Sequence, residues 1–263
     1  GIPLLKCSQK SLYTLIMRGR EIKDRPETTV NLEIARHAAH ANNGSYPPDK
    51  EIWAQTRNPA LHRKDQELLW KSLHDGYKIG RYWERMTNPD MNNRAHCSGC
   101  DEDRETMQHI ITECTAPGQQ EIWEEASKLW AHYGHGSWPK GDKYGTILAA
   151  GLMRFENEGE RDEGAERGTI IISSTAWRCI WNVRCRRTIP GTESEEERQT
   201  SPEEARARFW KAMNSRFAID RNTTHKTYGK LAAKEALVHD TWHRLLDEPK
   251  DDWLQKGTGV LVG

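Results

Sequence analysis

Residues 97–114 read CSGCDEDRETMQHIITEC, and this stretch decides the local architecture of the chain. Three cysteines and one histidine, separated by two, eight and four residues, are the candidate metal ligands: Cys97, Cys100, His109 and Cys114. Thiolate and imidazole ligands in this order suit a tetrahedral zinc site, and Gly99 relieves the bend between the first two. We expect one structural zinc ion, with no coordination position left open for water.

The spacing of the last two ligands constrains the backbone that carries them. His109 and Cys114 are five residues apart, which places them about 140° apart around an ideal α-helix. The helix must therefore loosen or end before Cys114 if both side chains are to face one metal ion. The alternative is that these four residues are ordinary reduced cysteines and a surface histidine.

The other cysteines and histidines give weaker signals. Three histidine pairs stand at helix-compatible spacing, but each lacks a clustered third ligand: His37 and His40, His132 and His135, His239 and His243. We expect these histidines to be solvated or to pack in the core. The remaining cysteines are expected to pack as small apolar groups, and they are Cys7, Cys179 and Cys185.

Outward from the cysteine motif, periodicity and capping signals predict a mainly α, multi-helix module with a small Cys-Cys-His-Cys knuckle. The expected helices are 28–42, a short one from Asp49, 59–73, 77–86, 117–133, 169–188, one from Ser201, and 230–246. Within 169–188 the isoleucine run favours a strand, but the spacing of Trp177, Trp181 and Arg184 and the length of the segment favour a helix. Residues 154–167 are strongly acidic and contain glycine, so we expect a loop there.

Composition limits the class of protein. The 263 residues include 39 Lys or Arg and 39 Asp or Glu, so no net charge attracts nucleic acid to the whole molecule. Only 35% of residues are hydrophobic, and eleven tryptophans are expected to anchor the core. The six cysteines do not form a secreted disulfide pattern, and we find no signal peptide or membrane span. We therefore expect a soluble intracellular protein, and the first residue, Gly1, suggests a fragment or a processed chain.

Two stretches are locally basic, at 57–94 and 206–234, and the first alternates cations with aromatic residues. This pattern suits phosphate contact together with stacking on unpaired bases. The residues selected for nucleic-acid contact are Lys71, Lys78, Arg81, Tyr82, Arg85 and Arg94. Three of these cations are three and four residues apart, so we expect Lys78, Arg81 and Arg85 to share one helix face. The alternative is that both stretches are solvated helix faces.

Several motifs together resemble one family. Residues 69–71 (LWK), 77–83 (YKIGRYW), the cysteine motif with ETMQHI at 105–110, WRCIWNVRCRR at 177–187 and the closing 252–263 resemble the C-terminal zinc-binding region of fungal-type LINE-like non-LTR retrotransposon polyproteins. Residues 8–18 (SQKSLYTLIMR) resemble the end of the RNase H domain that precedes this region. Residues 178–179 and 64–66 depart slightly from the family pattern, which leaves a decayed copy open.

The resemblance implies a non-catalytic, zinc-stabilised nucleic-acid-binding module that positions template RNA or target DNA, in a nuclear polyprotein with reverse transcriptase and RNase H domains as partners. Two alternatives stay open, a remnant or subunit of an RNase H or reverse transcriptase enzyme and a helical interaction protein whose zinc is purely structural. The implied organisation is an RNase H end at 1–27, a helical zinc-binding region at 28–134, a helical region at 135–188, a linker at 189–200 and a helical tail at 201–263.

Overall fold

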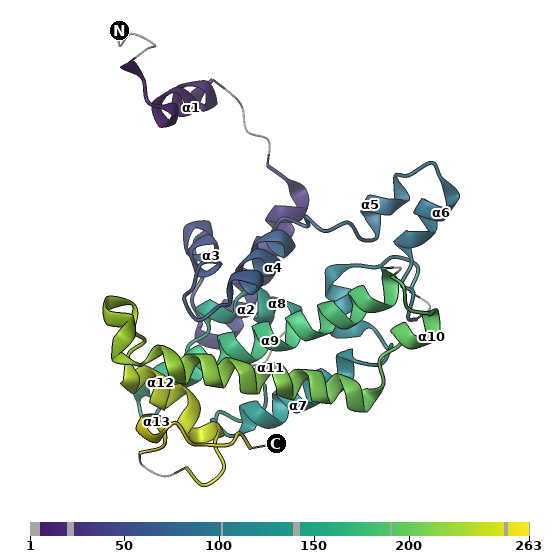
Figure 1. Cartoon of the computed structure of the whole chain (residues 1–263). Helices are drawn as coiled ribbons and strands as arrows, with labels where there is room; N and C mark the ends of the chain where they lie inside the picture. The colour runs from purple at the N-terminus through teal and green to yellow at the C-terminus, as the bar shows by residue number, and fades with distance from the viewer. Residues whose placement is uncertain are drawn as a thin grey trace.

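The computed structural model describes residues 6–19, 24–100, 102–138, 143–189, 191–249 and 252–262. It is mainly helical, as the sequence predicts, with one two-stranded hairpin (Figure 1). The elements of the first half are α1 (Gln9–Arg18), α2 (Pro26–Asn43), α3 (Asp49–Gln55), α4 (Arg63–Leu73), α5 (Arg81–Glu84), α6 (Pro89–Asn92), η2 (Asn93–Ala95), the π-helix η3 (His109–Glu113) and α7 (Gln119–Ala131). The second half contains α8 (Lys143–Leu148), η4 (Ala150–Leu152), β1 (Glu156–Asn157), β2 (Glu160–Arg161), α9 (Glu163–Thr188), α10 (Glu195–Arg198), α11 (Pro202–Thr223), η5 (Lys226–Leu231), α12 (Glu235–Trp242), η6 (His243–Leu245) and α13 (Trp253–Lys256).

Helix α9 is the central element of the fold. It contacts α4, α7, α8, α11 and α12, which surround it in Figure 1. The three consecutive isoleucines 170–172 are all buried, so their apolar surface is covered on every side of the helix. Enclosure by neighbouring helices outweighs the modest helix propensity of β-branched residues. The predicted helix over 169–188 is confirmed, and the strand interpretation of the isoleucine run is wrong.

The start of α9 corrects the prediction of an acidic loop over residues 154–167. Strands β1 and β2 form a tight hairpin, and α9 already begins at Glu163. Asp162 caps this helix, because its carboxylate accepts a hydrogen bond of 2.9 Å from the backbone N–H of Ala165. Acidic residues at a helix N-terminus are stabilised by the helix dipole, so the high density of acids marked the start of a helix.

Glycines within α9 allow neighbouring helices to approach closely. A Cβ atom on Gly164 would lie 2.3 Å from the backbone oxygen of Asp240 in α12. A Cβ atom on Gly168 would lie 2.1 Å from the hydroxyl of Tyr133, which follows α7. That hydroxyl donates a 2.5 Å hydrogen bond to the carbonyl of Thr241. The first turns of α9 therefore fit against α12 and the end of α7 only without side chains at these positions.

Tryptophans anchor the core, as the composition predicts. Four of them are almost completely buried, and they are Trp130, Trp177, Trp242 and Trp253. The indole N–H of Trp242 donates a 2.9 Å hydrogen bond to Asp220 on α11. Asp220 also pairs with Arg167 of α9 and Arg216 of α11, at 2.7 and 3.1 Å. One buried carboxylate therefore links α9, α11 and α12, with its charge balanced by two guanidinium groups.

Capping signals locate some helix ends correctly and others wrongly. Ser201 accepts a 3.1 Å hydrogen bond from the N–H of Glu204, and α11 begins at Pro202 as predicted. Helix α4 begins at Arg63 instead of residue 59, because the Asn58 side chain accepts from the N–H of Ala60 and holds a turn. The helix predicted over 230–246 is divided among η5, α12 and η6, with extended backbone at Ala232 after η5.

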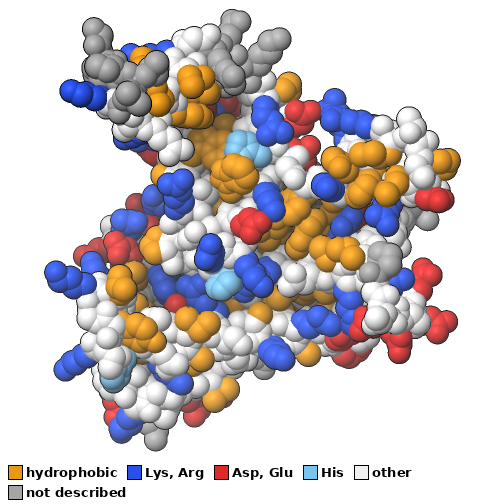
Figure 2. All heavy atoms as spheres, turned by 45° about the horizontal axis from the view of Figure 1, so that its top comes forward, with side chains coloured by type: hydrophobic (Ala, Val, Ile, Leu, Met, Phe, Trp, Pro, Cys, Tyr) orange, Lys and Arg blue, Asp and Glu red, His pale blue; other side chains and the backbone are white. Residues whose placement is uncertain are grey.

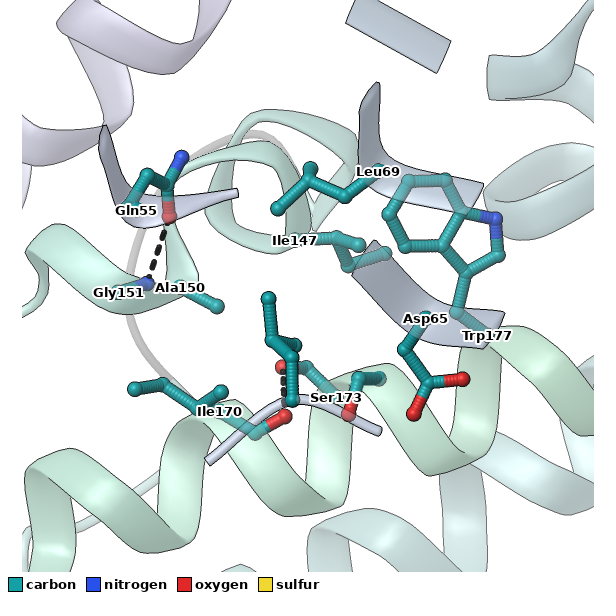
Figure 3. Close-up of a pocket in the computed structure, with 11 residues that line it drawn as sticks. Gln55, Asp65, Leu69, Ile147, Ala150, Gly151, Ile170, Ser173 and Trp177 are labelled. Carbon is teal, nitrogen blue, oxygen red and sulfur yellow. Dashed lines mark hydrogen bonds between the residues drawn. The ribbon is translucent and has the colours of Figure 1, made fainter. Parts of the chain in front are cut away.

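A small cavity lies where α3, α4, η4 and α9 meet (Figure 3). Gln55 closes one side of it, since its side-chain oxygen accepts a 2.9 Å hydrogen bond from the N–H of Gly151. Apolar side chains of Leu69, Ile147 and Ile170 line much of the rest. The volume is about 10 Å³, which is space for a single water at most. A space of this size has no room for a ligand larger than water.

One hydrophobic core extends across the region boundaries predicted from the sequence, and its residues range from Leu32 to Leu261. The segment predicted as a linker, 189–200, contains the short helix α10. Helix α1 has no buried residue and stands apart from the other helices in Figure 1. Among the described residues, no helix combines the length and apolar character that crossing a bilayer requires.

The close contact at Gly164 generates a stability prediction. Gly164→Ala should lower the free energy of unfolding by about 1–3 kcal/mol, because the new methyl group overlaps the α12 backbone. Alanine favours a helix over glycine by about 1 kcal/mol, so a loss of stability isolates the steric effect. Urea denaturation measures it, and Gly191→Ala, where the new Cβ meets no atom within 4 Å, is the control. A variant more stable than the parent would show that α12 does not approach α9 this closely.

Candidate metal centre

The first two candidate ligands lie on a turn that follows η2. The N–H of Cys97 bonds to the carbonyl of Glu102 at 3.1 Å, which closes the turn. Inside it, the N–H of Gly99 points at the sulfur of Cys97 at 3.5 Å. An N–H directed at a sulfur favours the thiolate, which is the form that binds metal.

The other two ligands lie at the two ends of the π-helix η3, because His109 is its first residue and Cys114 directly follows its last. This arrangement resolves the spacing problem found in the sequence. The N–H of Cys114 bonds to the carbonyl of His109 at 2.8 Å, an i to i+5 bond. A turn that closes after five residues returns Cys114 to the side of His109, whereas an α-helix would separate them by about 140°. The prediction that the helix loosens before Cys114 is confirmed.

All four ligand atoms come together at one point. They lie within 4.8 Å of one another. The sulfurs of Cys97 and Cys114 are 3.7 Å apart, those of Cys100 and Cys114 are 4.0 Å apart, and the Cys100 sulfur is 3.3 Å from Nε2 of His109. Tetrahedral zinc with Zn–S of about 2.3 Å and Zn–N of about 2.0–2.1 Å requires S···S of about 3.8 Å and S···N of about 3.5 Å. The cluster therefore has the size of one metal coordination shell.

The thiols are electrostatically coupled to each other. Their hydrogen bond raises the pKa of Cys97 and lowers the pKa of Cys114, and burial adds to the first shift and opposes the second. The positive charge of Arg187 also lowers the pKa of Cys114. Cys97, His109 and Cys114 are buried. A largely buried group of three thiols and one imidazole suits a divalent cation such as zinc.

The C-terminal end of α9 packs on the knuckle, meaning residues 97–114. A Cβ atom on Gly99 would lie 2.6 Å from the Cζ atom of Arg187 and 2.6 Å from the Cβ atom of Ala116. The Nε atom of Arg187 lies 3.5 Å from the hydroxyl oxygen of Ser98. Gly99 therefore makes room for a guanidinium group as well as relieving the turn.

A buried ion pair fixes the knuckle to α9. Arg184 holds both carboxylate oxygens of Glu105, with an Nε–Oε1 distance of 3.0 Å and a second, shorter contact through Nη2. The Glu105 side chain is fully buried and that of Arg184 is 10% exposed. Burial lowers the pKa of Arg184, but the bonds and charge of Glu105 outweigh it and leave the pKa raised. This pair is therefore a strong, water-excluded link.

The backbone around Glu105 is also tightly packed. The N–H of Glu105 bonds to the carbonyl of Ala95 at 2.8 Å. Gly80, with a positive φ of 40°, lies so close that a Cβ atom would be 2.1 Å from the carbonyl oxygen of Glu105. The residues before the knuckle are consequently held against it by backbone contacts as well as by the ion pair.

The predicted nucleic-acid residues do not form the single helix face that the sequence suggested. Helix α5 spans only Arg81–Glu84, and Lys78 precedes it on the far side of Gly80, whose left-handed backbone breaks the helix. Arg81 is held by Glu27 of α2. The prediction that Lys78, Arg81 and Arg85 share one helix face is wrong, because sequence spacing indicates a common face only within a continuous helix.

The other members of that set lie near aromatic rings. Lys78 lies 5.5 Å from the ring centre of Tyr82, and the guanidinium of Arg94 lies 5.3 Å from that of Trp83. Lys71 pairs with Glu67 at 2.6 Å and lies 5.5 Å from the ring centre of Tyr77. Lys78, Arg85 and Arg94 are exposed. The set is therefore distributed over two surfaces, one around α5 and one on α4.

The paired histidines serve structural roles. His37 and His40 both pack on Tyr46, and His239 stacks on His243 with ring centres 4.7 Å apart. His135 contacts Asp162 at 2.8 Å. In the part of the chain that the structure describes, the cluster of Cys97, Cys100, His109 and Cys114 is the one group with metal-site geometry.

The sequence analysis missed three arginines of α9 that hold neighbouring segments in place, two of which contact the knuckle. Arg178 bonds both oxygens of the buried Asp65 at 2.6 and 2.7 Å, and Arg184 and Arg187 contact the knuckle. A signal was present, because arginines in a helix rich in isoleucine and tryptophan require buried partners. The partners themselves lie about 80 to 110 residues away in sequence, and local periodicity does not identify them.

No protein-family model, curated protein or solved structure matches this chain. The geometry of the site therefore carries the functional argument.

The ion pair generates a second prediction. Glu105→Gln should lower the free energy of unfolding by about 3–5 kcal/mol, because it leaves Arg184 buried without its counter-charge. Denaturation at saturating zinc measures this effect apart from metal loss. The control is Glu84→Gln, which removes an exposed pair with Arg104 and should leave the melting temperature unchanged. Equal effects of the two substitutions would contradict a special role for Glu105.

Proposed function

We propose that this chain is a non-catalytic, zinc-stabilised nucleic-acid-binding module of a retrotransposon reverse transcriptase/RNase H polyprotein, where it positions template RNA or target DNA. The observation that carries the proposal is the cluster of three cysteines and one histidine with ligand atoms within 4.8 Å of one another. Sulfur and imidazole ligands at tetrahedral spacing favour zinc among the common divalent ions.

The ligand set supports a structural metal. Three thiolates and one imidazole complete a tetrahedral shell, and a catalytic zinc keeps one position for water or substrate. The cluster also lies between two anchors, the packing of Arg187 on Gly99 and the buried pair of Glu105 with Arg184. A metal at this position would hold the knuckle in the shape that α9 contacts.

The surface next to the knuckle supports contact with nucleic acid. Lys78, Arg85 and Arg94 are exposed there, with Tyr82 and Trp83 partly exposed between them. Cations combined with aromatic rings contact phosphates and stack on bases.

The N-terminal helix offers a surface for the RNase H domain that we propose as a partner. Residues 8–18 resemble the end of that domain. Helix α1 exposes Tyr13, Leu15 and Ile16, each more than half accessible. Exposed apolar side chains on one helix suit packing against a further domain.

The zinc assignment generates a third prediction. Purified protein should contain one zinc ion per chain, and Cys97→Ser or His109→Ala should lower both the zinc content and the melting temperature, because each removes one of four ligands. Elemental analysis and calorimetry measure the two quantities. Cys7→Ser, outside the cluster, is the matched control. If demetallated protein keeps its full thermal stability, the metal does not maintain the fold.

Nucleic-acid binding generates a fourth prediction. The wild-type chain should bind a labelled single-stranded oligonucleotide at low salt, and the logarithm of affinity should fall linearly with the logarithm of salt concentration, by about 0.7 per phosphate contact. Fluorescence anisotropy across a salt series measures the slope. Zinc-loaded, folded protein that does not bind RNA or DNA at any salt concentration would favour an interaction protein with purely structural zinc.

A further inference from the structure

A long groove lies between α4 and α11, with α9 as its floor. One part, of about 570 Å³, is lined by residues of α4, α9 and α11. A second part, of about 840 Å³, continues along α11 towards the segment before α12. Both parts are lined by His62, Arg216 and Ile219, so they adjoin at these residues. On the face seen in Figure 2, Lys and Arg side chains gather around the middle of the view, interspersed with apolar side chains.

The groove is basic although the whole chain is neutral. The first part has one carboxylate, Glu67, and four cations, which are Lys64, Lys71, Arg178 and Arg216. The second part adds three carboxylates and five further cations, which are Arg63, Arg154, Arg161, Arg167 and Lys234. The entire sequence has equal numbers of basic and acidic residues. A concave wall with one dominant charge concentrates its field on the space that it encloses.

The cations of the groove are of two kinds. Arg178 and Arg216 are fixed in the wall, by Asp65 at 2.6 Å and by Asp220 at 3.1 Å. Lys64 is exposed at the rim. Lys71 is 38% exposed and pairs with Glu67, which is 61% exposed, so this pair is weak and can be exchanged for another anion. The rim lysines are therefore available to a ligand, and the partly buried arginines preserve the shape of the wall.

Two aromatic rings line the first part of the groove. The rings of Tyr77 and Trp181 are 4.5 Å apart between centres, and both side chains are partly exposed. Lys71 lies 5.5 Å from the ring centre of Tyr77. Rings beside cations suit unpaired bases, whose faces are accessible, whereas a duplex keeps its bases stacked internally.

We propose that this groove binds single-stranded RNA or DNA, with phosphates at Lys64 and Lys71 and a base against Tyr77 and Trp181. This inference rests on the proposed function and locates its binding site. The two basic stretches, far apart in the sequence, supply opposite walls, with Lys64 and Lys71 from the first and Arg216 from the second.

The test compares variants with equal changes of charge. The probe is a labelled oligo-dT of about twenty nucleotides, used at a series of salt concentrations with the zinc-loaded full chain. Lys64→Ala with Lys71→Ala should weaken binding at least tenfold and reduce the salt slope by about 1.4, which corresponds to two contacts at about 0.7 each. Lys10→Ala with Lys50→Ala, at two exposed lysines outside both basic stretches, should bind within twofold of wild type. Glu67→Gln should bind more tightly, because it removes the carboxylate from the first part of the groove.

Two further experiments test whether a base stacks on Tyr77 and whether the groove prefers single strands to other polyanions. Tyr77→Leu should weaken binding about tenfold while Tyr77→Phe keeps it, and circular dichroism checks that both variants fold.

Duplex DNA and polyglutamate should compete weakly. If the wild-type chain binds the oligonucleotide and the variant lacking Lys64 and Lys71 keeps the same affinity and salt slope, the groove is not the binding site. The proposed function would then still stand. Equal competition by polyglutamate would overturn single-strand recognition. Absence of wild-type binding to any nucleic acid would instead reject the proposed function.

Discussion

The burial of most of α9 is the constraint on which the rest of the structure depends. A helix with isoleucine, tryptophan and cysteine around its circumference is stable in water only if other helices cover most of its surface. Helices α4, α7, α8, α11 and α12 provide this cover. Two glycines in its first turns admit close neighbours, and two arginines in its last turns reach the knuckle. The metal-site geometry is thus attached to the end of the helix that organises the core.

The local part of the site could be predicted from the sequence because its determinants are local. Ligand type and spacing identify Cys97, Cys100, His109 and Cys114, and helix geometry alone requires the departure from α-helix that η3 provides. The features that the sequence analysis missed or predicted wrongly depend on distant contacts or on backbone geometry. Arg184 finds Glu105 across 79 residues, and a left-handed Gly80 separates Lys78 from α5. The acidic composition of residues 154–167 led to the wrong prediction of a loop, because acidic residues there precede and begin a helix.

The same distinction applies to charge. Equal totals of basic and acidic residues predict no overall field, yet folding distributes the charges unevenly. Acidic residues such as Asp65 and Asp220 are buried against arginines, whereas Lys64 and Lys78 stay exposed. A carboxylate buried against an arginine balances that arginine at close range, so an exposed lysine is offset mainly by the acidic residues nearest to it. A neutral chain can therefore present a basic groove, and this arrangement exists only after the helices have packed.

The cluster of Cys97, Cys100, His109 and Cys114 has the size of one coordination shell, and we propose that it holds one zinc ion that stabilises the fold. Zinc-edge X-ray absorption on the purified chain examines the ligands of that ion. We expect a four-coordinate zinc with three sulfur ligands at about 2.3 Å and one nitrogen ligand at about 2.0–2.1 Å. A shell dominated by oxygen, or one with fewer than three sulfur ligands, would rule out this site.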